Sequence, residues 1–171
     1  SYGEALLQGV FASLSAFANS GFDLTGNSLI PFAQDYFVLL VTMLLIVAGA
    51  IGYPVLAEVK EYWSSRKKNY RFSLFTKVAV STYLFLVILG VMMIWLLEGA
   101  HSFRDKGWLE GLFYALFYSI TSRSAGLTVL DVSLFQESTL FFLSGLMIIG
   151  ASPSSAGGGI RTTTLAVMLL A

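Results

Sequence analysis

A glycine-rich segment interrupts the chain between two apolar runs, and it restricts the fold more than any other feature. Residues 150–164 read GASPSSAGGGIRTTT, with four glycines, three serines, one proline and one arginine. Ser138–Ile149 before it and Thr162–Ala171 after it are apolar. Inside a bilayer each backbone N–H or C=O group without a partner costs several kcal/mol, so such a break needs protein or a wet cavity around it. We interpret the two runs as one membrane crossing in two pieces.

Composition assigns the whole chain to a membrane. Of its 171 residues, 56% are hydrophobic and 12% are charged, whereas soluble domains carry about 25% charged residues. Disulfides and thiolate metal sites are excluded because the sequence contains no cysteine. The zero net charge gives no signal for nucleic acid. No catalytic set is evident, so we expect no enzyme, and because the chain ends inside an apolar run we expect a segment of a longer protein.

Two uncharged runs are long enough to cross a membrane. Tyr36–Ala57 has 22 residues and Val78–Leu97 has 20, and a spanning helix needs about 20. Two further apolar runs, Ala5–Phe17 and Leu109–Ile120, are too short to span. Both end in loops rich in glycine and hydroxyl residues, which indicates re-entrant helices.

Charge predicts the orientation. The loop Glu58–Lys77 holds six basic and two acidic residues, and the positive-inside rule places such a loop in the cytoplasm. Its centre, WSSRKKNYR, is interpreted as the membrane anchor, with docking of a cytoplasmic partner or anionic lipid as a second role. The regions before Tyr36 and from Glu98 to Glu137 hold eight acidic and three basic residues. Such an acidic outer face raises the local cation concentration.

The two re-entrant segments resemble each other. Residues 10–29 read VFASLSAFANSGFDLTGNSL, and residues 116–134 read LFYSITSRSAGLTVLDVSL. Each places hydroxyl residues at the helix end, then a glycine, then a closing Ser-Leu pair. A short helix that points its negative end at a pore, followed by a glycine loop that presents carbonyl oxygens, can form an ion filter. The expected filter residues are Asn19, Ser20, Gly21, Ser124, Ala125 and Gly126.

At these motifs the sequence resembles a known family. SLSAFANSGFD, SITSRSAGLT and GASPSSAGGGIRTTT together resemble the Trk/Ktr/HKT superfamily of potassium transporters, and most closely its bacterial Ktr-type membrane subunit. The resemblance implies an all-α integral membrane fold of repeated M1–pore helix–filter loop–M2 units, similar to a potassium channel, with a broken M2 helix. Residues 1–63 would hold the pore helix, filter loop and M2 of the second unit. Residues 64–73 would form a cytoplasmic loop, and residues 74–171 would hold the third unit.

The resemblance also implies roles for individual residues. Gly21 and Gly126 would be the filter glycines of the two units. The glycine-rich segment would lie below the filter and gate the pore. Its gate residues would be Gly150, Ser152, Pro153, Ser154, Ser155, Gly157, Gly158, Gly159 and Arg161.

The implied function is potassium uptake across the cytoplasmic (inner) membrane of a bacterium by a multi-pass protein with a four-unit pore. No cofactor is expected in this chain, and potassium or sodium would be the transported or coupling ion. The implied partners are a second copy of the subunit, a cytoplasmic nucleotide-binding ring and the lipid bilayer. One alternative is a sodium-selective or nonselective transporter of the same superfamily. Another is a non-conducting scaffold whose re-entrant loops serve subunit contact.

Other interpretations of single features stay open. The glycine-rich segment could be a surface loop or a phosphate-binding loop, although it lacks the G-x-x-x-x-G-K-[ST] spacing. Arg161 could form an electrostatic barrier, bind loop carbonyls that hold a gate closed, or snorkel to the interface. We expect Arg123 to point away from the pore and pair with Asp131 or Glu137. Asp23 and Asp131 are candidates for the outer mouth of the pore, but we expect both carboxylates to be solvated caps.

Overall fold

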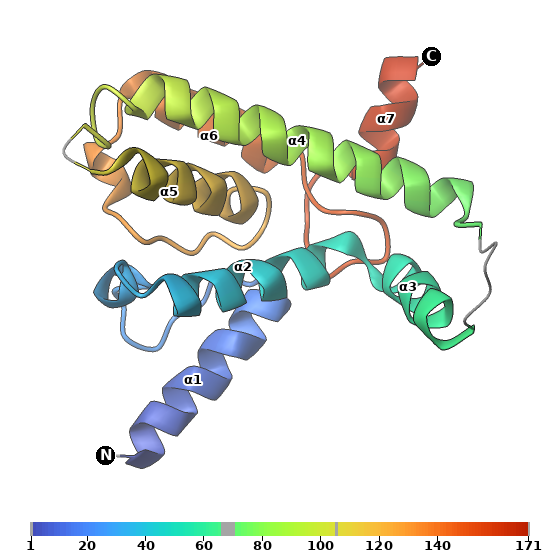
Figure 1. The fold of residues 1–171 in the computed structure, drawn as a ribbon, viewed down its shortest axis with the longest axis horizontal. Coiled ribbons are helices and arrows are strands. Elements are labelled where there is room, and N and C mark those ends of the chain that lie inside the picture. Colours follow the sequence, from blue (N-terminus) through green and yellow to red (C-terminus); the bar gives the residue numbers. More distant parts are fainter. Residues whose placement is uncertain (1, 66–70, 105, 171) are drawn as a thin grey trace.

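The computed structural model describes residues 2–65, 71–104 and 106–170, and the regular elements in these residues are helices joined by loops (Figure 1). Within these residues the β pairing is limited to an isolated parallel bridge between Ile149 and Ile160. The elements follow in the order α1 (Tyr2–Phe17), η1 (Ile30–Phe32), α2 (Tyr36–Ile51), α3 (Tyr53–Ser65), α4 (Leu74–Glu98), α5 (Trp108–Thr121), η2 (Val132–Leu134), α6 (Glu137–Ile148) and α7 (Thr162–Leu170).

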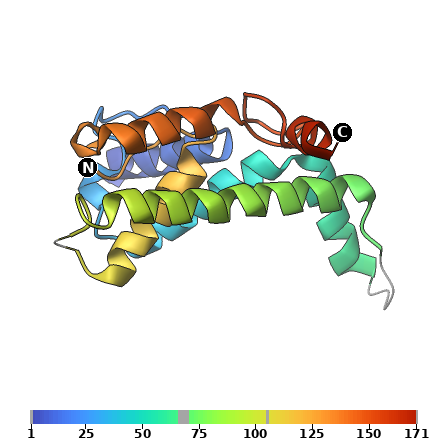
Figure 2. The same cartoon turned by 90° about the horizontal axis from the view of Figure 1, so that it is seen from above.

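The long helix α4 supports the rest of the fold. It begins after Ser73, whose hydroxyl accepts the Thr76 N–H at 3.2 Å, and it continues for 25 residues to Glu98. The predicted span Val78–Leu97 is therefore confirmed as one continuous helix. By length and composition α4 is the one described helix that could cross a membrane by itself. Helix α5 packs along one side of α4 and α6 runs along another (Figures 1 and 2).

The second predicted span is broken, contrary to the prediction of one helix over Tyr36–Ala57. Helix α2 ends at Ile51, α3 starts at Tyr53, and their axes differ by 106°. Gly52 adopts a φ of 93°, which favours glycine. Pro54 has no N–H group to donate and its ring obstructs the carbonyl four residues before it, so the helix cannot continue. The chain instead turns sharply at this point and continues as α3 (Figure 1).

The core lies where α5 is enclosed by its neighbours. Tyr114, Phe117 and Ser119 of α5 are almost completely buried. The Ser119 hydroxyl donates to the Val87 carbonyl of α4 at 2.9 Å. Gly90 permits this approach, because a side-chain carbon there would overlap the Ser119 hydroxyl. The α4–α5 contact therefore depends on the absence of a side chain at one position.

Gly90→Ala is expected to destabilise the protein by about 1–3 kcal/mol, the usual cost of adding a methyl group to a well-packed contact. The matched control is Gly145→Ala, since Gly145 is also in a helix but has open space around its Cα. Alanine favours helix by about 1 kcal/mol over glycine, so the control should lose no stability. Thermal unfolding of the purified full-length protein measures both variants. Equal midpoints would contradict the packing argument.

Candidate functional site

The two predicted filter loops have matching local hydrogen bonds. In the first loop the Ser15 hydroxyl donates to the Phe22 carbonyl at 2.7 Å. In the second loop the Thr121 hydroxyl donates to the Leu127 carbonyl at 2.9 Å. Each acceptor residue directly follows the glycine of its loop. The hydroxyl at the end of each short helix therefore fixes the backbone just beyond the glycine.

The two loops meet at their glycines. Gly21 and Gly126 have φ values of 71° and 70°, in the left-handed region that glycine tolerates best. A side-chain carbon on Gly21 would overlap the carbonyl oxygen of Ala125, whereas one on Gly126 would have no neighbour within 4 Å. Further along, the Leu29 N–H donates to the Thr128 carbonyl at 2.9 Å. The structure thus brings together residues that lie about 100 positions apart in the sequence.

Asn19 anchors the first loop to α2. It has a positive φ of 51°, and its side chain is 6% exposed. Its Nδ2 donates to the carbonyls of Phe17 and Ile46, each at 3.3 Å. Gly49 lies close by, because a side-chain carbon there would overlap the Phe17 carbonyl. The first loop is therefore positioned by the last two turns of α2, just before that helix breaks.

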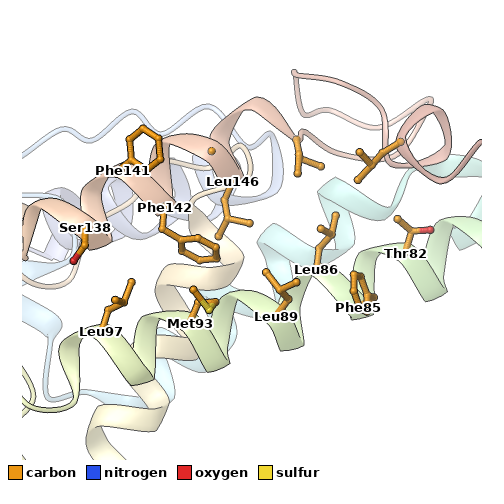
Figure 3. Close-up of a pocket in the computed structure, with 13 residues that line it drawn as sticks. Thr82, Phe85, Leu86, Leu89, Met93, Leu97, Ser138, Phe141, Phe142 and Leu146 are labelled. Atoms are coloured by element: carbon orange, nitrogen blue, oxygen red, sulfur yellow. The ribbon is translucent and has the colours of Figure 1, made fainter. Parts of the chain in front are cut away.

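A cavity of about 390 Å³ with several polar residues in its lining lies where the loops and the glycine-rich segment converge. Its lining residues are Asn19, Ser122, Arg123, Ser124, Gly126, Met147, Gly158 and Gly159. A larger groove of about 640 Å³ runs between α4 and α6 (Figure 3). Its lining is apolar apart from hydroxyls such as those of Thr82 and Ser138, so it lacks convergent polar groups. The smaller cavity is therefore the better candidate for a site that handles a polar or charged species.

The glycine-rich segment forms backbone hydrogen bonds with the end of α2, where that helix breaks. Ser152 N–H donates to the Ala50 carbonyl at 3.0 Å, and Ala156 N–H donates to the Gly49 carbonyl at 3.2 Å. In return, Tyr53 N–H donates to the Ser154 carbonyl at 3.1 Å. The last carbonyls of a helix have no partners within it, so the break after α2 frees acceptors for the segment. The end of α2 and the start of α3 thus supply hydrogen-bond partners for three backbone groups of the interruption, while Ser154, Ala156 and residues 158–160 stay exposed.

The segment is also held by its own contacts. Gly150 N–H donates to the Ile160 carbonyl at 3.0 Å, which brings the two ends of the segment together. Arg161 Nη1 donates to the Gly157 carbonyl at 2.7 Å and to the Ser152 carbonyl at 3.4 Å. Of the three interpretations of Arg161, the structure therefore has the contact to loop carbonyls. One guanidinium group joins the two sides of the segment.

The Ser124 side chain connects the second predicted filter loop to the glycine-rich segment. Its hydroxyl accepts the Gly158 N–H at 3.2 Å. The neighbouring Gly157 is buried, and a side-chain carbon on it would lie 2.6 Å from the Ser124 hydroxyl. Sequence reasoning placed Ser124 in the filter for its carbonyl oxygen and missed this contact. The contact becomes visible only in the structure, where the glycine-rich segment folds back onto the loop.

The predicted pairing of Arg123 with Asp131 or Glu137 is wrong. Arg123 is 2% exposed, and its guanidinium group stacks over the Tyr83 ring at 4.0 Å. Its Nη1 donates to the Tyr83 carbonyl at 3.1 Å, and its Nε donates to the Ser119 carbonyl at 3.3 Å. Backbone carbonyls and an aromatic ring therefore replace the expected carboxylate. Arg123 therefore joins α5 to α4.

The two acidic residues after the loops are turn caps, as predicted. The hydroxyl and N–H of Ser133 both donate to Asp131, at 2.7 and 3.0 Å, and hold its pKa below the usual value. Burial raises the pKa of Asp23 slightly, but hydrogen bonds from Thr25 and Ser28 outweigh it and lower the pKa overall. Each carboxylate therefore accepts hydrogen bonds from the turn that directly follows it in the sequence. Of the charged residues used to predict the orientation, those outside the described residues are Arg66, Lys67, Lys68 and Asp105.

Known cation transport proteins match this sequence over nearly its whole length. The family model TrkH, described as a cation transport protein, matches residues 2–171. The chain is 56% identical over its full length to the Ktr system potassium uptake protein D of Bacillus subtilis, and it covers 38% of that protein. It is 34% identical over 95% of its length to the Ktr system potassium uptake protein B of Vibrio alginolyticus, and it covers 36% of that protein. The chain thus spans little more than a third of these relatives.

A solved structure has the same fold. The potassium transporter TrkH from Vibrio parahaemolyticus superposes with a TM-score of 0.77 over 91% of this chain. The chain covers 32% of that protein, and the sequence identity is 20%. At this identity the match establishes the arrangement of the helices.

Proposed function

The chain belongs to the TrkH family of cation transport proteins, and we propose that it forms part of a potassium-translocating subunit in the bacterial cytoplasmic membrane. The family is one of transporters, not enzymes. The relatives that are potassium uptake proteins support potassium as the ion. The proposal therefore concerns how these helices and loops would handle that ion.

We assign the elements to two pore-forming units. Residues 1–63 supply a pore helix (α1), a filter loop and the M2 segment α2–α3 of one unit. Residues 74–171 supply M1 (α4), a pore helix (α5), a filter loop and a broken M2 (α6 and α7) of the next. Residues 64–73 connect the units in the cytoplasm. The matching hydrogen bonds from Ser15 and Thr121 support this assignment, because they recur at corresponding positions of both units.

The observation that carries the proposal is the meeting of the two glycine loops beside the cavity of about 390 Å³. A potassium ion would lose part of its hydration shell and be bound by backbone carbonyls of both loops. The residues proposed to present them are Asn19, Ser20, Gly21, Ser124, Ala125 and Gly126. Two further units of the full-length protein would complete the ring. The membrane potential, about 2.3 kcal/mol per charge per 100 mV, would draw the ion inward.

The glycine-rich segment is the proposed gate. It lies on the α3 side of the filter loops (Figure 1), and its Gly158 contacts Ser124 of the filter loop. Arg161 would hold it closed through the carbonyls of Ser152 and Gly157. Opening would require these bonds and those to α2 to break together. We propose that a cytoplasmic nucleotide-binding ring controls this step, and that the subunit acts as a homodimer.

Ion uptake by the full-length protein tests the proposed function. We expect bacteria that lack their own potassium uptake systems to accumulate potassium from low external concentration when they produce it. Uptake should stop when the membrane potential is abolished, since the potential drives it. Equal uptake of sodium would favour the sodium-selective or nonselective alternative. Absence of uptake, with the protein present in the membrane, would favour the non-conducting scaffold.

A further inference from the structure

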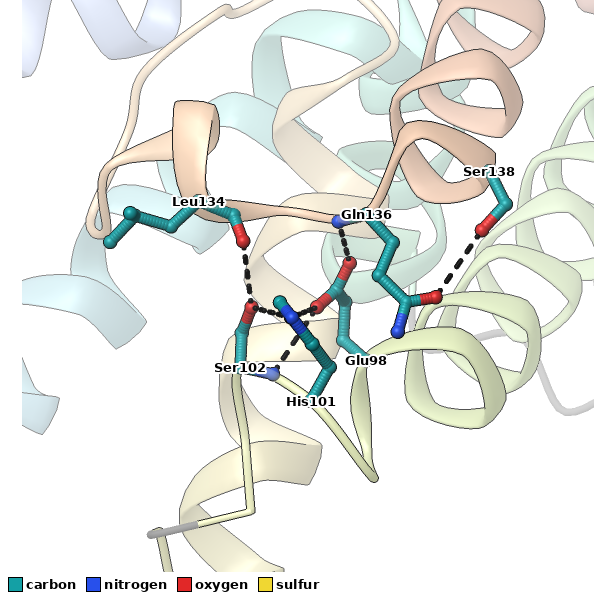
Figure 4. Close-up of polar contacts among 6 residues, drawn as sticks. All are labelled: Glu98, His101, Ser102, Leu134, Gln136 and Ser138. Carbon is teal, nitrogen blue, oxygen red and sulfur yellow. Dashed lines mark hydrogen bonds and ion pairs between the residues drawn. The ribbon is translucent and has the colours of Figure 1, made fainter.

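Glu98, the last residue of α4, has a carboxylate that is completely buried. Charged side chains are almost never fully buried unless they are paired, because leaving water is costly. Its Oε1 accepts the Gln136 N–H at 2.8 Å, and its Oε2 accepts the Ser102 N–H at 3.4 Å (Figure 4). His101 Nδ1 lies 3.6 Å from Oε2. Neither Lys nor Arg forms an ion pair with it among the described residues.

The carboxylate joins two places that are far apart in the sequence. Ser102 lies in the turn that follows α4, and Gln136 is the N-cap residue of α6. The chain between them contains α5, the second filter loop and η2. A helix N-terminus has free N–H groups and a partial positive charge, so it favours a carboxylate. Glu98 therefore closes the segment that carries the filter loop, and the Ser102 hydroxyl adds a contact to the Leu134 carbonyl at 3.4 Å. We call the hydrogen bonds of Glu98 to Ser102 and Gln136 the clasp.

A continuous set of contacts leads from the clasp to the filter loop. Phe135, beside Gln136, packs against the Tyr118 ring with the ring centroids 4.9 Å apart. The Tyr118 hydroxyl accepts the Leu130 N–H and donates to the Leu130 carbonyl, both at 2.8 Å. It also accepts the Val129 N–H at 3.3 Å. Val129 and Leu130 lie within four positions of Gly126. A displacement of Gln136 would therefore be passed on to the backbone of the filter loop.

We propose that Glu98 is a positioning residue for the filter loop around Gly126, acting through Gln136, Phe135 and Tyr118. The inference rests on the proposed function, because it concerns the filter of that function. The buried Glu98 carboxylate would hold the end of α4 against the start of α6, and so fix the chain on the outer side of the filter loop. Carbonyl oxygens select between ions by where they are held and how many of them reach the ion. Loss of the clasp should therefore change which ion is preferred.

The test measures potassium and sodium uptake by the full-length protein carrying Glu98→Gln or Glu98→Met. We expect the methionine variant to lower the potassium-to-sodium uptake ratio roughly twofold to thirtyfold, the range seen for changes along coupled contacts. Glu98→Gln should have a smaller effect, because its amide oxygen can still accept one N–H group. The matched control is Glu137→Gln, which changes an exposed acid in the first turn of α6 and should leave the ratio unchanged.

The ratio separates positioning from simple loss of folded protein. Misfolding reduces the uptake of both ions equally, so an unchanged ratio with lower total uptake in both Glu98 variants would overturn the inference. If the methionine variant does not reach the membrane, Glu98→Gln carries the test. A wild-type protein that takes up no potassium would instead overturn the proposed function, and the inference with it. If the wild-type protein takes up potassium and the Glu98 variants have a lowered potassium-to-sodium ratio, the result supports both the proposed function and the inference.

Discussion

Replacing Gly21 with alanine should nearly abolish potassium uptake by the full-length protein, whereas the same replacement at Gly126 should reduce uptake by a much smaller factor. Both glycines have positive φ values, so either alanine would pay about 1–2 kcal/mol for a left-handed conformation. Only at Gly21 would the new methyl group also overlap the backbone carbonyl of Ala125. A carbonyl in the facing loop cannot move aside as a flexible side chain can, so the two proposed filter loops would be forced apart.

The expected sizes differ accordingly. At Gly126 we expect uptake to fall by about tenfold, which corresponds to about 1.4 kcal/mol. At Gly21 overpacking adds about 1–3 kcal/mol, so the fall should reach about 100-fold. Initial rates of potassium uptake, divided by the amount of each variant in the membrane, measure the difference. Equal losses in the two variants would show that the contact of Gly21 with Ala125 is unimportant for conduction.

Deleting Ser154–Gly159 should produce a transporter that takes up potassium faster than the wild type and no longer responds to its regulator. The deletion removes the Gly157 carbonyl that Arg161 binds and the Gly158 N–H that binds Ser124. The hydrogen bond from Gly150 to Ile160 already brings the ends of the segment together, so the shortened connection can close without strain. We expect the rate to rise by about tenfold, which corresponds to a barrier lower by about 1.4 kcal/mol.

The deletion has an internal control. The filter glycines stay in place, so the preference for potassium over sodium should change much less than the rate. Flux measurements with both ions on vesicles containing the purified protein would give the two quantities together. An unchanged rate, with the deleted protein correctly inserted, would show that the glycine-rich segment is not the barrier to the ion.

The short-range features of this fold could be read from the sequence. The apolar run before Glu98 became the helix α4, and the repeated hydroxyl and glycine positions became matching hydrogen bonds from Ser15 and Thr121. These predictions succeeded because a helix and a turn depend mainly on residues close together in the chain.

The failures have two sources, a local break that hydropathy does not register and contacts over long range. The apolar run Tyr36–Ala57 was read as one span because hydropathy counts residues and does not register that Gly52 and Pro54 together end a helix. The partner of Arg123 was predicted as a carboxylate because opposite charges attract, yet the folded chain brings the Tyr83 ring and carbonyl to it. Neither the contact of Ser124 with Gly158 nor the clasp of Glu98 has a local signal, since each joins segments more than 30 positions apart.

The shared hydrogen bonds between the end of α2 and the glycine-rich segment affect the order in which the protein can be made. The carbonyls of Gly49 and Ala50 leave the ribosome about 100 residues before Ala156 and Ser152, whose N–H groups they accept. At a synthesis rate of about 5–20 residues per second, that gap lasts roughly 5–20 seconds. Water must bind these carbonyls during the delay, since lipid cannot. The end of α2 therefore has to wait near the membrane surface, or beside the insertion machinery, until the segment arrives.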